Sequence, residues 1–398
     1  MSHHDARSIR ALESRISRRR LVQGAAALGA SAPLMSLSFG GRLSASAQDA
    51  KNKVVWVSPR GTLEVLDDYP YWVAKRLGYF GDIETEILPA ILEATSSSKS
   101  VADGQADMSF VSPGVFSLGI EQGIDLVSVW QECSYDTFDF AFQIDSPITT
   151  IAELEGKTII LGDPGWSGIV DPMLKQGGVD PSSVRYVSAG TGWAQALAEG
   201  QGDAALSWAG LRAQWKAIGL NFKYILGADT SKFPANSFQI RRSDFEDASL
   251  TDLYTRYLRG YAMGLEFGYQ NPRAATQITM EEPSIAPALN ETFQDLNVAV
   301  ESFLEQANIY RGDWAKREGW GWADLAGWQI FLDTTKEIGQ LTQDIAVEDI
   351  VKNDYVAGAN DFDHAQVAAD AAAFKLSEGF AAVKLPESGP FAQATPVA

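Results

Sequence analysis

Short apolar runs alternate with amphipathic stretches along most of the chain after residue 53. β-Branched runs such as residues 54–57 are typical of strands, whereas the pattern of residues 69–77 is typical of a helix. Repeated strand–helix–strand alternation predicts a mostly parallel sheet with helices on both faces. The alternation starts again after residues 138–144, and from Ser249 onward the pattern is almost entirely helical. We therefore expect an α/β fold with two lobes and a helical C-terminal part.

A seven-residue pattern occurs at corresponding places in the two lobes. Residues 101–107 and 197–203 each contain a predicted helix end, an acidic residue, a glycine turn and an aspartate that begins a strand. Glycine is common after helices, so ordinary turn chemistry is one explanation. The matching position of the two copies favours a duplicated architecture instead.

These patterns divide the chain into four parts. We expect residues 48–143 and about 238–370 to form the first lobe together with the C-terminal helices. Residues 144–237 are expected to form the second lobe. Residues 371–398 are expected to contain the end of the C-terminal helices and a poorly ordered tail, because proline and glycine are frequent there.

Residues 1–47 have the three-part pattern of an export signal. Adjacent arginines at residues 18–20 follow a polar leader, an apolar run extends to about Phe39, and residues 45–47 form a small-x-small cleavage site. Adjacent arginines are typical of the twin-arginine route. A membrane anchor is the alternative, but glycines and Pro33 interrupt the apolar run. We predict that this segment is removed and that the mature protein is periplasmic.

Charge and residue usage exclude several classes of function. The chain has 51 acidic and 32 basic residues, and without residues 1–47 it has 49 and 25, a formal charge of −24. Because phosphate binding needs a basic surface, we expect no nucleic-acid partner. Cys133 is the only cysteine, and His364 is the only histidine after the signal. We therefore expect no disulfide, no catalytic residues, no metal site and no cofactor.

Several segments occur in the order found in one protein family. They are YWVAKRLGYF (71–80), DGQAD (103–107), IAELEGKTI (151–159), GVDP (178–181), ALAEGQGDAA (196–205), Asn271-Pro272 and AVEDIV (346–351). With them the chain resembles the periplasmic substrate-binding proteins of ABC importers, in the branch for sulfonates, nitrate and thiamine-pyrimidine precursors. The resemblance extends from about Val54 to about Asp363. It implies a type II periplasmic-binding-protein fold, with a mostly parallel sheet in each lobe.

The resemblance also implies a function and its partners. A small-molecule ligand would close the two lobes about a hinge, and an ABC permease in the inner membrane would receive it. We expect a monomer. A ligand-sensing module and an enzyme similar to pyrimidine-precursor synthases are the alternatives from other classes. Such enzymes use histidine and cysteine chemistry, and here only His364 and Cys133 remain, far apart in sequence.

Ligands of open α/β sheets lie beyond the carboxyl ends of the strands, often at helix N-termini. This rule and the resemblance select the same loops. The predicted ligand-binding residues are Arg60, Asp68, Tyr69, Phe110, Ser112, Gln131, Trp166, Ser167, Trp193 and Trp208. Their aromatic rings favour a planar aromatic or heteroaromatic ligand, such as a vitamin or pyrimidine precursor or an aromatic acid. An alkyl- or aryl-sulfonate of the taurine type is the alternative, although Asp67 and Asp68 would repel an anion.

Several of these residues have a second explanation. Arg60 could pair with a ligand carboxylate or, equally, with Glu64. Asp68 could hold a ligand amine or stabilise a helix N-terminus. Ser112 and Ser167 could donate to a ligand or serve only as helix caps.

Other residues are expected away from the ligand. Trp72 lies in an apolar run that favours the core, and the same holds for Phe110. Glu132 is expected at the surface or at the hinge. Helix packing is the expected role of one C-terminal cluster, with a permease-facing or ligand-facing patch as the alternative. The cluster consists of Trp314, Trp320, Trp322 and Trp328.

Overall fold

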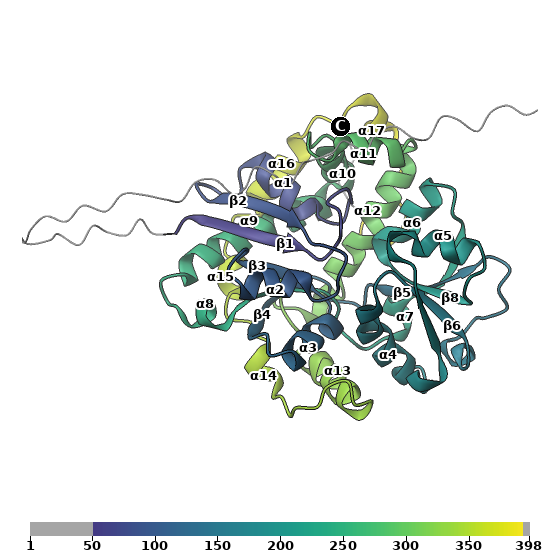
Figure 1. The fold of residues 1–398 in the computed structure, drawn as a ribbon. Coiled ribbons are helices and arrows are strands. Elements are labelled where there is room, and N and C mark those ends of the chain that lie inside the picture. Colours follow the sequence, from purple (N-terminus) through teal and green to yellow (C-terminus); the bar gives the residue numbers. More distant parts are fainter. Residues whose placement is uncertain (1–50, 393–398) are drawn as a thin grey trace, which may run out of the picture. The chain divides into compact units, whose positions relative to one another are not determined.

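The computed structural model describes residues 51–392. The predicted export signal at residues 1–47 and the last part of the predicted tail, residues 393–398, lie outside the described residues. The strands of the described part form two five-stranded sheets (Figure 1). The first sheet holds β1 (Lys53–Ser58), β2 (Glu84–Pro89), β3 (Met108–Val111), β4 (Leu126–Gln131) and β10 (Ser237–Arg241). The second holds β5 (Phe138–Gln143), β6 (Thr158–Leu161), β7 (Arg185–Ser188), β8 (Ala204–Trp208) and β9 (Phe222–Ile225).

The two sheets have the same topology. The strand order is β2-β1-β3-β10-β4 in the first and β7-β6-β8-β5-β9 in the second. In each sheet the first three strands are parallel, and the fourth is antiparallel to both of its neighbours. The expected two-lobe α/β fold is confirmed.

The repeated seven-residue pattern has the same structural role in both lobes. Asp107 precedes β3, and its carboxylate accepts a hydrogen bond from the Val55 N–H at 2.8 Å. Asp203 precedes β8 and accepts from the Thr158 N–H at 2.8 Å. The glycines of the two turns have φ angles of 73° at Gly104 and 74° at Gly200, a conformation that disfavours other residues. The duplicated architecture is therefore confirmed at the level of individual hydrogen bonds.

The chain crosses between the sheets twice, after β4 and before β10. The two crossover segments pair with each other, since the Cys133 N–H donates to the Asn236 carbonyl at 2.9 Å and the Ala235 N–H donates to the Cys133 carbonyl at 3.2 Å. Strand β5 belongs to the second sheet, whereas the sequence analysis ended the first lobe at residue 143. The reason is that β5 immediately follows the first crossover and pairs with β8 and β9.

Helices connect the strands in both lobes. The first lobe contains α1 (Tyr69–Leu77), α2 (Ser96–Ala102) and α3 (Pro113–Glu121). The second contains η1 (Ile151–Leu154), η2 (Pro164–Trp166), α4 (Ser167–Gln176), η3 (Pro181–Ser183), η4 (Gly190–Gly192), α5 (Trp193–Ala198), α6 (Ala209–Ala217) and α7 (Gly227–Thr230). Helix α1 has Pro70 in its first turn, where a missing N–H costs little, and ends at Gly78.

The chain after β10 is helical, as the sequence pattern predicts. It contains α8 (Arg242–Glu246), α9 (Thr251–Gln270), α10 (Pro272–Met280), α11 (Ala286–Thr292), α12 (Leu296–Arg311), η5 (Trp314–Lys316), α13 (Leu325–Glu337), α14 (Val347–Ile350), α15 (Val356–Ala359), α16 (His364–Ala373) and α17 (Glu378–Ala382). Helix α9 packs against α1, α15 and α16. In the described part of the chain, no helix combines the length and the apolar character needed to cross a bilayer.

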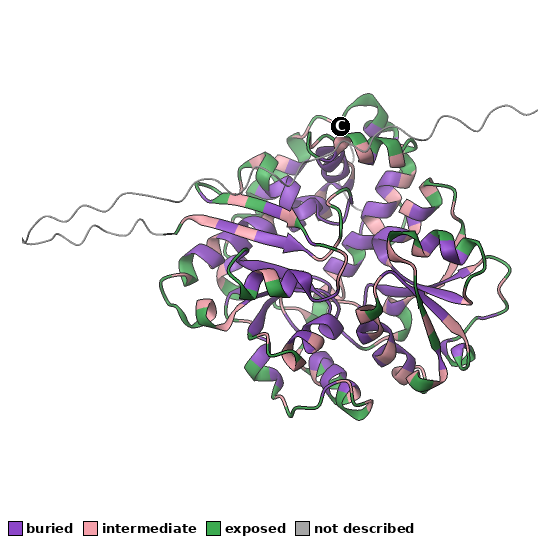
Figure 2. Cartoon of the chain, viewed as in Figure 1, coloured by how far each residue is buried: buried purple, intermediate pink, exposed green. Residues whose placement is uncertain are grey.

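Buried residues are concentrated on the inner strands of both sheets and on β4, as Figure 2 shows, whereas the edge strands β2, β7 and β9 are largely half-buried or exposed. Trp56 is fully buried in the first lobe, and the rings of Tyr71, Phe110 and Phe238 contact its indole edge-on. In the C-terminal part, Trp328 is also fully buried. The structure confirms helix packing for Trp328, and Trp320 is likewise buried, with its indole N–H donating to Glu266 at 3.0 Å.

Helix α12 contacts both lobes. It packs on α10 of the C-terminal part and on α6 of the second lobe, and Figure 1 shows it between them. The Ser302 hydroxyl donates to the Gly210 carbonyl at 2.9 Å, and the Gly210 N–H donates to the Gln306 side chain at 3.2 Å. Helix α12 thus links the first turn of α6 to the rest of the molecule.

Candidate functional site

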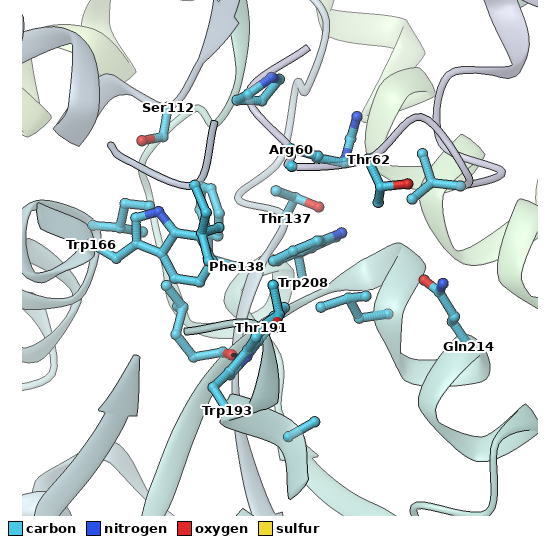
Figure 3. A pocket seen from close by; sticks show the side chains of 18 of the residues that line it. Arg60, Thr62, Ser112, Thr137, Phe138, Trp166, Thr191, Trp193, Trp208 and Gln214 are labelled. Carbon is cyan, nitrogen blue, oxygen red and sulfur yellow. Dashed lines mark hydrogen bonds between the residues drawn. The ribbon is translucent and has the colours of Figure 1, made fainter. Parts of the chain in front are cut away.

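A cavity of about 490 Å³ is lined by both lobes and by the crossover segments (Figure 3). This volume is in the range of roughly 300–1,000 Å³ that is usual for small-molecule sites. Six of the ten predicted ligand-binding residues line it together, although they come from five separate places in the sequence. They are Arg60, Phe110, Ser112, Trp166, Trp193 and Trp208.

Three tryptophans of the second lobe form one wall of the cavity. The rings of Trp193 and Trp208 are stacked, with centroids 6.0 Å apart and an interplanar angle of 25°. Trp166 meets both rings edge-on, at 5.5 Å from Trp193 and 6.3 Å from Trp208. All three are only partly buried. They therefore keep ring surface available for stacking on a planar molecule.

Two of these rings are held in place by hydrogen bonds. The Trp193 indole N–H donates to the Leu206 carbonyl at 2.9 Å, and the Trp208 indole N–H donates to the Asp67 carboxylate at 3.1 Å. The ring of Trp166 lies directly on Gly162, where any side chain would overlap it. Each ring is therefore oriented before a ligand arrives.

The Arg60 guanidinium lies at the cavity between two carboxylates. Its Nη1 donates to Asp68 at 2.6 Å, and its Nη2 lies 3.0 Å from Asp67. It also lies 5.8 Å from the centre of the Phe110 ring. The sequence left Glu64 open as a partner of Arg60; the structure pairs Arg60 with the two aspartates instead, because the loop before α1 turns them toward it.

Burial sets the protonation of this group of charges. It raises the pKa of Asp68 to about 6, against the attraction of Arg60, which lowers it. Burial also raises the pKa of Asp67, opposed by Arg60 and by the hydrogen bond from Trp208. Because a pKa of about 6 lies below neutral pH, the Asp68 carboxylate is ionised there and balances the positive charge of Arg60.

Polar groups lie on the crossover side of the cavity. The Ser112 hydroxyl caps helix α3 by accepting from the Val115 N–H at 3.2 Å, and its own O–H remains able to donate. The Thr137 hydroxyl donates to the Gln306 side chain at 3.3 Å. The cavity therefore has an aromatic wall and a polar floor.

The other four predicted residues do not line this cavity. The Asp68 carboxylate is engaged with Arg60. Tyr69 is 1% exposed and packs on the ring of Phe303 at 4.3 Å. Gln131 is buried at the crossovers, and Ser167 begins helix α4 outside the lining. These four side chains face the protein interior or another surface, which the sequence could not indicate.

Gln131 has a structural role instead. Its amide donates to the carbonyls of Cys133 and Ala235, both at 2.9 Å, and its carbonyl oxygen accepts from the Trp328 indole at 2.7 Å. These bonds tie the two crossover segments to each other and to helix α13.

The expectation that Glu132 lies at the surface or at the hinge is only half right. Glu132 follows β4 at the first crossover, but it is 1% exposed. Its carboxylate accepts from the Trp130 indole at 3.1 Å and from the Tyr261 hydroxyl at 3.2 Å. Burial raises its pKa to about 8, despite these two hydrogen bonds.

The sequence analysis missed several residues of the lining. Four of them follow helical spacing along α6 and its C-cap, and this amphipathic stripe is a signal that could have been used. They are Leu211, Gln214, Trp215 and Ile218. Asn236, at the second crossover, also lines the cavity. No local sequence pattern indicates this role for Asn236, because the residue reaches the cavity only through the path of the second crossover in the folded chain.

Nucleophilic and metal-binding groups are few in the described residues. Cys133 lines the cavity, but burial raises the pKa of its thiol well above the usual value. His364 begins helix α16 and is not part of the lining. Between residues 51 and 392, no group of three or more His, Cys, Asp or Glu side chains is arranged to hold a metal ion.

Comparison with known proteins identifies a family. The family described as NMT1/THI5 like matches residues 67–275, which is more than half of the 398 residues. This segment contains Asp67, all three wall tryptophans and Asn236. No curated protein gives a significant match.

Solved structures share the fold over most of their length. The alkanesulfonate-binding protein SsuA of Xanthomonas axonopodis pv. citri, bound to MOPS, has a TM-score of 0.55 at 13% identity, over 75% of this chain and 98% of that one. The ligand-binding component of an ABC-type import system from Staphylococcus aureus, with zinc bound, has a TM-score of 0.57 at 12% identity, over 77% and 99%. The aliphatic sulphonate binding protein SsuA of Escherichia coli has a TM-score of 0.53 at 13% identity, over 75% and 91%. At these identities the likeness is one of fold.

Proposed function

The chain belongs to the NMT1/THI5-like family, and on this basis we propose that it is the substrate-binding component of an ABC importer. Its two lobes close around a small planar aromatic or heteroaromatic molecule, such as a vitamin or pyrimidine precursor or an aromatic acid. A permease in the inner membrane then receives this molecule. The protein acts as a monomer in the periplasm, and the twin-arginine signal predicted at residues 1–47 directs its export.

The observation that carries the proposal is the aromatic wall of the cavity. Trp166, Trp193 and Trp208 present oriented rings at the edge of a cavity of about 490 Å³ between two sheets. Stacking on such rings adds about 0.5–1.5 kcal/mol per ring pair beyond the burial of apolar surface. A flat ring system gains most from this arrangement.

The charges disfavour a sulfonate group placed beside Arg60. Arg60 is the only charged residue in the cavity lining of the described part of the chain, and it is already paired with Asp67 and Asp68. A sulfonate here would have to compete with two fixed carboxylates for one guanidinium. Two structural relatives are described as sulfonate-binding, so sulfonates are the competing ligand class. We rank sulfonates below aromatic ligands because Arg60 is already paired with Asp67 and Asp68.

The chemistry of the cavity favours binding without catalysis. No histidine lies among the described residues that line it, and the Cys133 thiol is kept protonated by burial. A synthase-like enzyme would require a reactive side chain at the ligand. Turnover of a bound aromatic compound by the purified protein would contradict this part of the proposal.

A thermal-shift screen of the purified protein tests the ligand class. The panel contains aminopyrimidines, aromatic acids, alkanesulfonates, taurine and nitrate. A ligand present at 100 times its Kd stabilises the folded protein by about 2.7 kcal/mol, which raises the Tm measurably. We expect shifts with aromatic compounds. Shifts confined to the sulfonates, taurine or nitrate would overturn the assignment.

Substitution of Trp166 by alanine tests the wall directly. The Trp166 ring is partly exposed, and its indole N–H donates to no group in the described part of the chain, so its removal should leave the fold intact. We expect the affinity for the best aromatic compound, measured by calorimetry, to fall about tenfold or more. Trp322→Ala, at a partly exposed tryptophan outside the cavity lining, is the matched control and should bind normally. Equal affinity in both variants would mean that Trp166 does not contact the ligand.

A further inference from the structure

The side chain of Asn236 is buried at the cavity without a hydrogen-bond partner. Asn236 lines the cavity and is 8% exposed. Its amide oxygen has no partner among the described residues, and its amide nitrogen donates to none of them. The buried oxygen without a partner costs free energy, so a side chain of this kind in a cavity calls for a ligand that pairs with it.

Two other side-chain amides at the crossovers, those of Gln131 and Gln306, are paired within the protein. Gln131 uses both atoms of its amide at the crossovers. The Gln306 oxygen accepts from Thr137 and from the Gly210 N–H. The Asn236 backbone carbonyl is also occupied, since it accepts from the Cys133 N–H. Of the side-chain amides of Gln131, Gln306 and Asn236, only that of Asn236 has no partner within the described residues.

We propose that Asn236 selects the ligand by pairing with an adjacent donor and acceptor on the edge of its ring. A carboxamide accepts an N–H with its oxygen and donates to a ring nitrogen with its NH₂, the pairing that asparagine makes with adenine. The amide can turn about its Cβ–Cγ bond to present either atom. The three tryptophans stack on the faces of the ligand ring, and the Asn236 amide forms hydrogen bonds with its edge. This inference rests on the proposed function and narrows the ligand to amino-substituted nitrogen heterocycles.

A pair of probes of equal shape tests the inference. In 4-amino-2-methylpyrimidine an amino group lies beside a ring nitrogen, and 2,4-dimethylpyrimidine replaces that amino group with a methyl. Calorimetric titration is done above neutral pH, where both probes are uncharged. We expect the wild-type protein to bind the amino compound at least about fivefold more tightly, the lower end of the discrimination expected for a bidentate amide contact.

The Asn236→Leu variant should lose this preference and bind both probes equally. Its Tm should not fall, because the amide it removes has no partner between residues 51 and 392. Asn236→Ala gives the same test with a smaller side chain. Gln329→Leu is the matched control, since Gln329 is a partly exposed amide on α13 outside the cavity lining. It should keep the preference.

The outcomes separate the inference from the proposed function. If the probes bind the wild type equally, or if Asn236→Leu and Asn236→Ala keep the preference, Asn236 does not read the ligand and the inference fails while aromatic binding stands. If no aromatic compound in the screen binds the wild type, the proposed function fails and the inference fails with it.

Discussion

The Arg60 guanidinium, Asp67 and Asp68 form a charge cluster that is almost completely removed from water. The Arg60 side chain is 10% exposed and those of Asp67 and Asp68 are 3% and 1% exposed. One oxygen of Asp68 has no hydrogen-bond partner in the described structure. Because carboxylates buried without a counter-charge are costly, the stability of the first lobe depends on Arg60.

Replacing Arg60 with methionine should therefore destabilise the protein strongly. We expect the free energy of unfolding at neutral pH to fall by about 3–5 kcal/mol, since two buried carboxylates lose their partner. Part of the loss should be recovered near pH 5, where these groups can take up protons. Chemical denaturation at the two pH values measures this.

The matched control for this substitution is Arg76→Met. Arg76 is exposed near the end of α1, and its replacement should change stability by less than about 0.5 kcal/mol. If Arg60→Met were as stable as the control, the cluster would not need its guanidinium.

At the scale of elements, the first turn of α6 joins the lobes. Trp208 ends β8 in the second lobe, and its indole donates to Asp67 in the first. Gly210 follows two residues later, and a Cβ at this position would overlap the Asp67 carboxylate. The first turn of α6 can approach the first lobe this closely only because residue 210 has no side chain.

Gly210→Ala should push α6 away from the first lobe. We expect weaker binding of the best aromatic ligand and a lower Tm, because Trp208 loses its hydrogen bond to Asp67. Calorimetry and thermal unfolding measure the two effects. The control is Gly119→Ala in α3, where a Cβ makes only ordinary contacts and alanine should stabilise the helix by about 0.5–1 kcal/mol. Normal binding by Gly210→Ala would show that this contact does not shape the site.

At the scale of the whole molecule, buried carboxyl groups with raised pKa values lie around the crossovers. Burial raises the pKa to about 7 for Asp136, about 6 for Asp139 and about 7 for Glu305. Glu132 and Asp68 add two more, at about 8 and about 6. In the unfolded chain such groups titrate near pH 4. The folded protein therefore holds more protons than the unfolded chain between about pH 4 and pH 8.

This difference predicts that stability falls as the pH rises through that window. The sign follows from linkage, because the state that binds more protons is favoured at low pH. We expect the Tm at pH 8 to lie several degrees below the Tm at pH 5.5. Thermal unfolding across this range measures the slope.

Glu132→Gln should reduce the slope. Glutamine has a similar shape, and the Tyr261 hydroxyl can turn to accept from its NH₂. The glutamine side chain does not titrate, so it releases no proton as the pH rises. A Tm that rises from pH 5.5 to pH 8, or a slope unchanged in this variant, would contradict the explanation.

The sequence by itself determined the type of fold and the loops that surround the site. Strand and helix periods are local, so the alternation at residues 54–57 and 69–77 and the repeat ending at Asp107 and Asp203 could be interpreted without coordinates. The strand-end rule likewise selected Trp166, Trp193 and Trp208, because the carboxyl ends of strands converge in any sheet of this kind.

Only the tertiary structure decided which way the loop residues point and what they pair with. Tyr69 and Gln131 lie in the predicted loops or beside them but are buried elsewhere, and Arg60 is paired with aspartates rather than with Glu64. Asn236 lies outside the predicted strand-end loops, and the second crossover places it in the same cavity lining as the tryptophans. Pairing and burial depend on contacts between distant segments, and a local pattern carries no information about those contacts.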